Sequence, residues 1–249
     1  MKVEAVRLMV STTVFSLFLT LAVHAQTLEE LDAQRIQARQ NYDLEGSRVV
    51  FERLKTFVEE SSSDAANFSL AYSALAVAEL QRIVFEEEAP TPLERRTMGK
   101  IIDAAAKAGH VSLESLPDTS EKYRIRADLY GMMIRTNYQG KRYEKHMTTA
   151  KDMALELDPD NPDAQVTGSK RLLFAKKRRG GDIQEAMFHL NRALELEESH
   201  VMALVLRGFA HEKLEDYAAA KADWNRALEL NPLCKPAKDN LLRMVDEGH

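Results

Sequence analysis

Apolar side chains recur every three or four residues along most of this 249-residue chain, with polar side chains between them. This spacing is typical of amphipathic α-helices, which present one apolar face. Helix-start and helix-stop residues divide the pattern into segments. We expect helices at about residues 28–42, 44–60, 64–87, 92–108, 120–138, 141–157, 162–178, 182–197, 201–214, 217–230 and 233–246.

The expected boundaries have local physical causes. Thr91-Pro92-Leu93-Glu94 combines an N-cap hydroxyl, proline at the first helical position and a glutamate that can close a capping box. Asn161-Pro162 repeats the cap and proline, and Gly180-Gly181 can adopt the left-handed backbone that ends a helix. The chain is therefore predicted to form five antiparallel helix pairs, followed by a helix that caps the open end.

One hexapeptide occurs twice. Asn191-Arg192-Ala193-Leu194-Glu195-Leu196 recurs at residues 225–230, an offset of 34 residues, and Leu190 and Trp224 put large apolar groups at one equivalent position. An offset of this length is typical of repeats that stack helix pairs.

The last of these units, residues 201–232, resembles the tetratricopeptide repeat (TPR) family. In the family pattern, small residues allow two helices to approach closely, a bulky side chain fills the gap between them and a proline ends the unit. Here the small residues are Gly208, Ala220 and Ala227, the bulky one is Trp224 and the proline is Pro232. His211 and Leu204 depart from the usual pattern. The resemblance implies an all-α, TPR-type α-solenoid. We expect residues 26–110 to be a less regular N-terminal helical region and residues 119–249 to hold the repeats and the capping helix.

The same resemblance implies a partner-binding face on the first helix of the last unit. Carried over residue by residue, that face consists of Met202, Val205, Phe209, Glu212 and Lys213. In the alternative interpretation, the three apolar members are buried against the capping helix or the preceding pair. Earlier in the chain, a continuing groove would be lined by parts of residues 68–84 and 130–138.

A second candidate site follows from a longer spacing. The segment 154–157 lies 39 residues before its partner at 193–196, so the unit between them has five extra residues. A longer first helix or turn through Lys176, Lys177, Arg178 and Arg179 would explain the difference, and insertions in solenoids often lie on the binding face. These cations would bind an acidic peptide, an anionic ligand or lipid head groups. Alternatively, they are a solvated helix end.

The first 25 residues have the pattern of a secretory signal peptide. Lys2 and Arg7 precede an apolar run, and Val23-His24-Ala25 supplies small residues for cleavage after Ala25. The run is shorter than the roughly 20 apolar residues that a spanning helix needs. We expect an exported protein in a bacterial periplasm, without a lipid anchor, because the residue directly after the cleavage site is Gln26 and not a cysteine.

Composition limits the chemistry. The chain has 34 basic and 39 acidic side chains, and this acidic balance disfavours nucleic acid as a partner. Cys234 is the only cysteine, and the histidines lack metal-ligand spacing. Neither a phosphate loop nor a nucleophile elbow occurs. We therefore expect no enzyme activity, catalytic residue, metal or cofactor.

These observations favour a non-enzymatic, exported scaffold or adaptor that binds a protein or peptide in the cell envelope. The alternative is a periplasmic accessory protein for a small molecule or lipid. The signal segment and the irregular N-terminal helices resemble, more weakly, the T-component of tripartite (TRAP) transporters. An apolar channel through the stack would favour this alternative, and an open groove would favour the scaffold.

Overall fold

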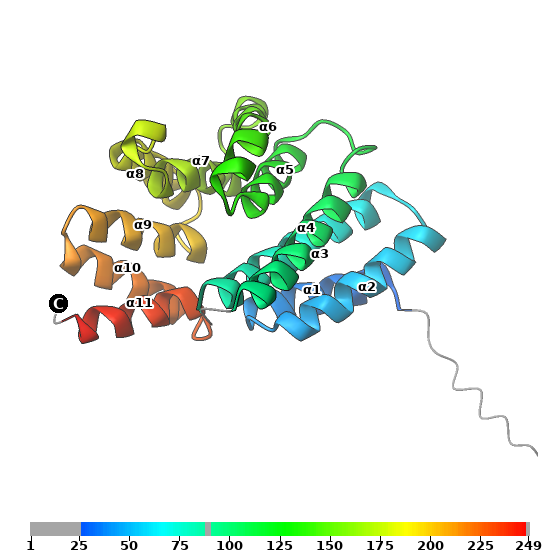
Figure 1. Ribbon diagram of the computed structural model, residues 1–249, viewed down its shortest axis with the longest axis horizontal. Helices are drawn as coiled ribbons and strands as arrows, with labels where there is room; N and C mark the ends of the chain where they lie inside the picture. The colour runs from blue at the N-terminus through cyan, green and yellow to red at the C-terminus, as the bar shows by residue number, and fades with distance from the viewer. Residues whose placement is uncertain (1–25, 88–90, 248–249) are drawn as a thin grey trace, which may run out of the picture.

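The computed structural model describes residues 26–87 and 91–247. The signal segment predicted for residues 1–25 lies outside the described part. Within that part the secondary structure is helical, with no strand, which confirms the all-α prediction (Figure 1). The helices are α1 (Leu28–Gln40), α2 (Leu44–Glu60), α3 (Asp64–Glu87), α4 (Pro92–Ser112), α5 (Ser120–Met133), α6 (Asn137–Leu157), α7 (Pro162–Phe174), η1 (Lys177–Arg179), α8 (Ile183–Leu196), α9 (Val201–Lys213), α10 (Tyr217–Leu230) and α11 (Lys235–Asp246).

Most helix ends lie where the cap residues predicted them. The Thr91 hydroxyl accepts the Glu94 N–H, and the Glu94 carboxylate accepts the Thr91 N–H at 2.7 Å, which completes the predicted capping box. Asn161 caps α7 by accepting the Ala164 N–H at 3.1 Å. Gly180 has a φ of 81°, the left-handed conformation expected of it.

Four boundaries differ from the prediction by four or five residues. Helix α4 continues to Ser112 rather than ending near 108, and α5 ends at Met133 rather than near 138, because the backbone is extended at Ile134. Helix α6 begins at Asn137 rather than near 141, because the Thr136 hydroxyl accepts the Gln139 N–H at 3.2 Å and starts the helix earlier. Helix α7 ends at Phe174 rather than near 178. The extra residues of the long unit form the 3₁₀ turn η1, so the turn, rather than a longer helix, accounts for the insertion.

The helices stack as a solenoid in chain order. Each odd-numbered helix from α1 to α9 packs on the next helix to form an antiparallel pair, and each pair packs on the one that follows. The first helices also contact one another in series, from α1 through α3, α5 and α7 to α9. They therefore form the inner layer of the coil in Figure 1, and the second helices form the outer layer.

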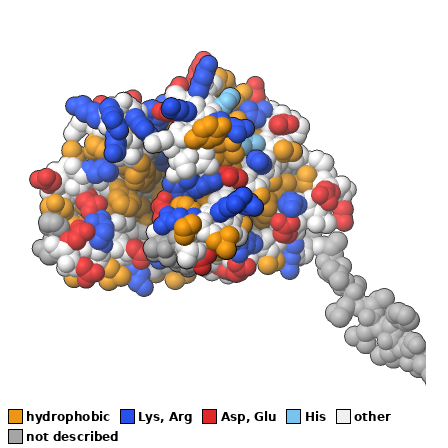
Figure 2. Space-filling view, viewed as in Figure 1, with side chains coloured by type: hydrophobic (Ala, Val, Ile, Leu, Met, Phe, Trp, Pro, Cys, Tyr) orange, Lys and Arg blue, Asp and Glu red, His pale blue; other side chains and the backbone are white. Residues whose placement is uncertain are grey.

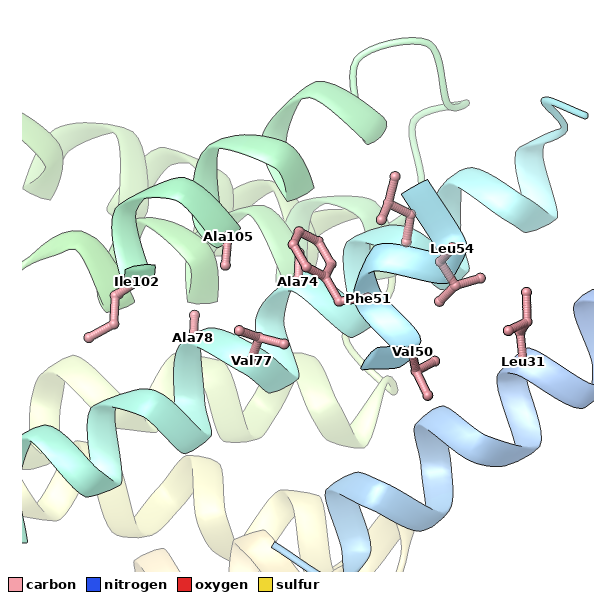
Figure 3. Packing of buried hydrophobic residues seen from close by; sticks show 10 residues of the cluster. Leu31, Val50, Phe51, Leu54, Ala74, Val77, Ala78, Ile102 and Ala105 are labelled. Carbon is pink, nitrogen blue, oxygen red and sulfur yellow. The ribbon is translucent and has the colours of Figure 1, made fainter. Parts of the chain in front are cut away.

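The core runs along the whole stack. Its first cluster joins four helices, with Leu31 of α1, Phe51 of α2, Val77 of α3 and Ile102 of α4 packed together (Figure 3). Helix α3 is long and apolar enough to cross a membrane by length and composition, but 61% of its most apolar stretch is buried inside the structure. It serves here as a core helix.

The last repeat depends on one close helix contact. Trp224 of α10 is fully buried, and its indole N–H donates to the Val205 carbonyl at 3.0 Å. A Cβ at Gly208 would lie only 2.3 Å from the Trp224 Nε1 atom. The small residue that the repeat pattern places here is therefore a steric requirement of the indole.

The two ends of the solenoid meet. Tyr42, in the turn between α1 and α2, packs against the last core cluster, and its hydroxyl lies 3.5 Å from the Sγ atom of buried Cys234. Nearby, the Asn231 side-chain amide donates to the Gln40 carbonyl at 3.2 Å. The first helix pair is thus joined to the loop between α10 and α11.

Tyr42 has a backbone conformation that is unusual for a residue other than glycine. Its φ is 55°, in the left-handed region that costs a non-glycine residue about 1–2 kcal/mol. Glu215 has the same conformation, with a φ of 62°, in the corresponding turn between α9 and α10, and its side chain is exposed. The two turns have the same backbone conformation, but only the Tyr42 side chain contacts residues that are distant in the sequence.

We expect opposite effects when each residue is replaced by glycine. Tyr42→Gly relieves backbone strain but removes the side chain that joins the ends, so the free energy of unfolding should fall by about 2 kcal/mol. Glu215→Gly relieves the same strain without losing a contact, so stability should stay constant or rise slightly. Urea denaturation measures both. Equal effects of the two variants would mean that Tyr42 is only a turn residue.

His110 of α4 is half-buried in an aromatic cluster. Its ring lies 4.1 Å from the Tyr130 ring, centroid to centroid, and its Nε2 atom has no hydrogen-bond partner among the described residues. Burial, with the positive charges of Arg126 and His146, lowers the pKa of His110 from 6.5 to about 4. The folded protein therefore keeps this imidazole neutral.

Stability should consequently depend on pH below neutrality. Between about pH 6.5 and 4 the unfolded chain binds a proton at His110 that the folded chain does not, so the free energy of unfolding falls as the solution is acidified. His110→Phe should flatten the curve in this range, and His146→Phe, which removes only one of the charges that lower the pKa of His110, should flatten it much less. Denaturant titrations across this pH range test it; equal curves for wild type and His110→Phe would contradict it.

Candidate functional site

The inner layer carries a continuous chain of polar contacts that crosses four helices. It begins on α1, where Asp32 accepts hydrogen bonds from Ser69 of α3 at 2.8 Å and from Arg35 at 2.9 Å. The Arg35 guanidinium lies over the ring of Tyr72, 4.8 Å from its centroid. A cation over an aromatic face is attracted by the ring's negative potential, so α1 and α3 are tied together here.

Tyr72 also contacts α5. The Arg124 guanidinium lies 5.4 Å from the centroid of the same ring and pairs with Glu121, and the Tyr72 hydroxyl donates to Glu121. Burial and the negative charge of Glu121 raise the pKa of Tyr72, so the hydroxyl remains a donor. Tyr72 is therefore shared by two arginines from two different helices.

Asp128 continues the contacts to α7. Its carboxylate is 4% exposed, accepts the Thr167 hydroxyl at 3.1 Å and pairs with Lys170 at 2.8 Å. Arg124, one turn earlier on α5, lies 3.6 Å away. The buried carboxylate is thus balanced from both helices, as a buried charge requires.

Two further polar contacts flank this network. Arg39 of α1 donates to Glu79 of α3 at 3.0 Å, and His200, which caps α9, lies 3.1 Å from Asp163 of α7. Burial raises the pKa of Glu79, but the charges of Arg39 and Lys170 outweigh it and lower the pKa overall. The carboxylate of Glu79 therefore stays ionised.

The positive and negative charges of this network and of the two contacts that flank it nearly cancel. The cations and carboxylates that share these contacts are Arg35, Arg39, Arg124 and Lys170 against Asp32, Glu79, Glu121, Asp128 and Asp163. Figure 2 shows a hollow in the side of the molecule that it presents, with charged side chains on one side of the hollow and hydrophobic ones on the other. A surface of this kind offers both hydrogen-bond donors and hydrogen-bond acceptors, and its charges do not add up to a strong electrostatic potential of one sign.

The residues predicted on α9 divide into two groups. Met202 and Phe209 are partly exposed, and Phe209 contacts the rings of Phe174 and Trp224 edge-on. Val205 is only 1% exposed and belongs to the core, as in the alternative interpretation of this face. Glu212 pairs with Arg243 of the capping helix, and Lys213 is exposed. Met202 and Phe209 pack partly against the core and keep some surface exposed, as Lys213 does.

The predicted cationic run lies just after α7. Lys176, Lys177 and Arg178 are exposed, and Arg179 donates to the Asn137 side-chain carbonyl at 3.0 Å. The ring contact between Phe174 and Phe209 places the end of α7, two residues before the run, next to α9. The structure therefore brings the start of the second candidate site beside the first.

Sequence reasoning did not single out the polar network of the inner layer. Its members are spread over four helices, and only short-range pairs such as Arg124 and Asp128 are visible locally. The useful signal would have been charged residues at positions that helical periodicity assigns to a buried face. The described residues contain no group of three His, Cys, Asp or Glu side chains that could hold a metal.

Comparison with known proteins agrees with this architecture. A family profile of the tetratricopeptide repeat matches residues 201–234. A thermophilic TPR protein of Thermus thermophilus has a similar structure, with a TM-score of 0.62 and 14% identity, over 88% of this chain and 99% of that one. YrrB, a TPR protein with an unusual peptide-binding site, aligns at a TM-score of 0.41 and 12% identity, over 86% of this chain and 98% of its own.

Curated relatives match only in part. FK506-binding protein-like of Mus musculus is 32% identical over 96 residues, 39% of this chain. A DnaJ homolog subfamily C member 7 homolog of Schizosaccharomyces pombe is 30% identical over 110 residues, 43% of this chain. The chain spans 27% and 21% of the lengths of these two proteins. The molecule is an α-solenoid of the TPR type, and residues 201–234 form a tetratricopeptide repeat.

The network around Asp128 should contribute strongly to stability. Asp128→Ala leaves the 7%-exposed Arg124 without one of its partners and Thr167 without its acceptor, so we expect a loss of about 3 kcal/mol. Lys170→Gln, at a side chain that is 28% exposed, should cost about 1 kcal/mol. Urea denaturation of both variants tests the difference. A loss for Asp128→Ala no larger than that for Lys170→Gln would show that the buried contacts add little.

Proposed function

We propose that this protein is a non-enzymatic scaffold that binds an extended segment of a protein partner along its inner surface. The observation that carries the proposal is the inner layer itself, in which first helices from α1 to α9 present polar and aromatic side chains along one hollowed face. Helix α9 adds Met202 and Phe209, whose partly exposed apolar groups suit side chains of such a segment.

Export is part of the proposal. The residues that support it are the charged start, apolar run and small residues before the expected cleavage site at Ala25. We propose that the protein acts in the periplasm and that its partner lies in the cell envelope. A small-molecule or lipid ligand, as in the transporter-accessory interpretation, is less favoured. The recess among α2, α3 and α4, of about 360 Å³, is lined mainly by apolar side chains, with Arg48 and Glu52 among them, but it is open to solvent rather than an enclosed channel.

The test compares two arginines of similar exposure on opposite layers. Arg39 on α1 is 47% exposed and pairs with Glu79, and Arg226 on α10 is 50% exposed and pairs with Glu229. The protein, tagged at its carboxyl terminus and expressed in its own cells, is used to capture partners from the envelope fraction. Arg39→Gln should weaken binding of a stoichiometric partner by about tenfold, and Arg226→Gln should leave it unchanged.

The outcomes separate the alternatives. Equal partner binding by both variants would place the interaction away from the inner surface. A co-purifying small molecule without a protein partner would favour the accessory interpretation. Mass spectrometry of the same material gives the amino terminus, and a mature chain that begins elsewhere than Gln26 would contradict the proposed cleavage after Ala25.

A further inference from the structure

A recess of about 290 Å³ lies where α6 begins, and none of its lining residues belongs to the polar network of the inner layer. It is lined by Asn137, Gly140, Lys141, Glu144, Arg171 and Arg179. We propose that this recess binds a phosphate group that carries about two negative charges. The proposal is independent of the partner bound on the inner surface.

The arginines of the recess are positioned by a tight turn. Gly180 has left-handed backbone, and a Cβ at Gly181 would lie 1.9 Å from the Ala175 carbonyl oxygen, so both positions require glycine. Because the chain folds back here, Arg171 donates to the Arg179 carbonyl at 2.6 Å. Arg179 in turn donates to Asn137, the first residue of α6. The turn at the two glycines therefore positions the guanidinium groups of Arg171 and Arg179 beside the same recess.

The lining has an excess of positive charge. Lys141, Arg171 and Arg179 contribute three cations against the single carboxylate of Glu144, which pairs with Arg171. A phosphate monoester carries about −1.5 to −2 charges at neutral pH and so matches the net charge of the lining. Guanidinium groups suit its oxygens because their N–H donors form a planar fork. The positive end of the α6 dipole adds to the attraction.

The surroundings reinforce this field. Lys176, Lys177 and Arg178 are exposed on the adjoining turn, and their side chains form no ion pair within the described residues. The protein as a whole has a net charge of −5, so this concentration of unpaired cations is local. An anion is therefore drawn to this region and excluded from most of the remaining surface.

Two sources could supply the phosphate group, a soluble phosphate compound or a lipid head group. Calorimetric titration with inorganic phosphate probes the first. Co-sedimentation with phosphatidylcholine vesicles, with and without phosphatidic acid, probes the second. Binding in either assay supports the recess if it shows the variant pattern below, and the assay that gives it identifies the source.

The variants compare a lysine in the recess with one outside it. Lys141→Gln should weaken binding by about tenfold, because it removes one charged contact. Lys177→Gln removes the same charge from the adjoining turn and should change binding less than about twofold. Glu144→Gln should tighten binding, because it removes the carboxylate that competes for Arg171.

Three results would overturn the proposal. The first is the absence of saturable binding in both assays. The second is an equal loss for Lys141→Gln and Lys177→Gln, which would indicate general attraction to a cationic surface. The third is weaker binding by Glu144→Gln while its circular dichroism and thermal unfolding match wild type. None of these results depends on whether a protein partner binds the inner surface.

Discussion

Both candidate surfaces of this molecule depend on how closely neighbouring helices can approach. No helix pair buries its apolar stripe alone, so each must pack on the next at positions that lack bulk. Gly208 beneath the Trp224 indole is one such position. Gly109 of α4 is another, since a Cβ there would lie 2.8 Å from Leu129 and 3.0 Å from Ala74. These contacts bring the first helices side by side, which allows short polar contacts between them.

The two candidate surfaces differ in how their charges are balanced. On the inner layer, groups such as Asp128 and Arg124 are already paired within the protein. A partner there must replace these pairs or hydrogen-bond to their free edges, so such charges contribute more to selectivity than to affinity. In the recess beside α6, cations outnumber carboxylates. That surplus is available to an outside anion without breaking the fold.

Much of the fold could be predicted from the sequence because helix ends are set locally. Thr91 and Glu94 fix a boundary over three residues, and the 34-residue offset shows the repeat directly. The missed boundary at Asn137 depends on a single threonine cap. The inner network could not be predicted in the same way, since Thr167 and Asp128 are 39 residues apart and meet only after three helices have packed. Burial of Val205 likewise follows from the tertiary position of α9.

The contact between Tyr42 and Cys234 joins positions 192 residues apart. In an open solenoid, each repeat interacts only with its neighbours, and an end repeat can unfold while the others remain folded. Once the ends touch, neither terminal pair is free to fray without also exposing the other. Local opening therefore has no preferred starting point at an end, and the stack should lose its structure more nearly as one cooperative unit than a linear array of the same length.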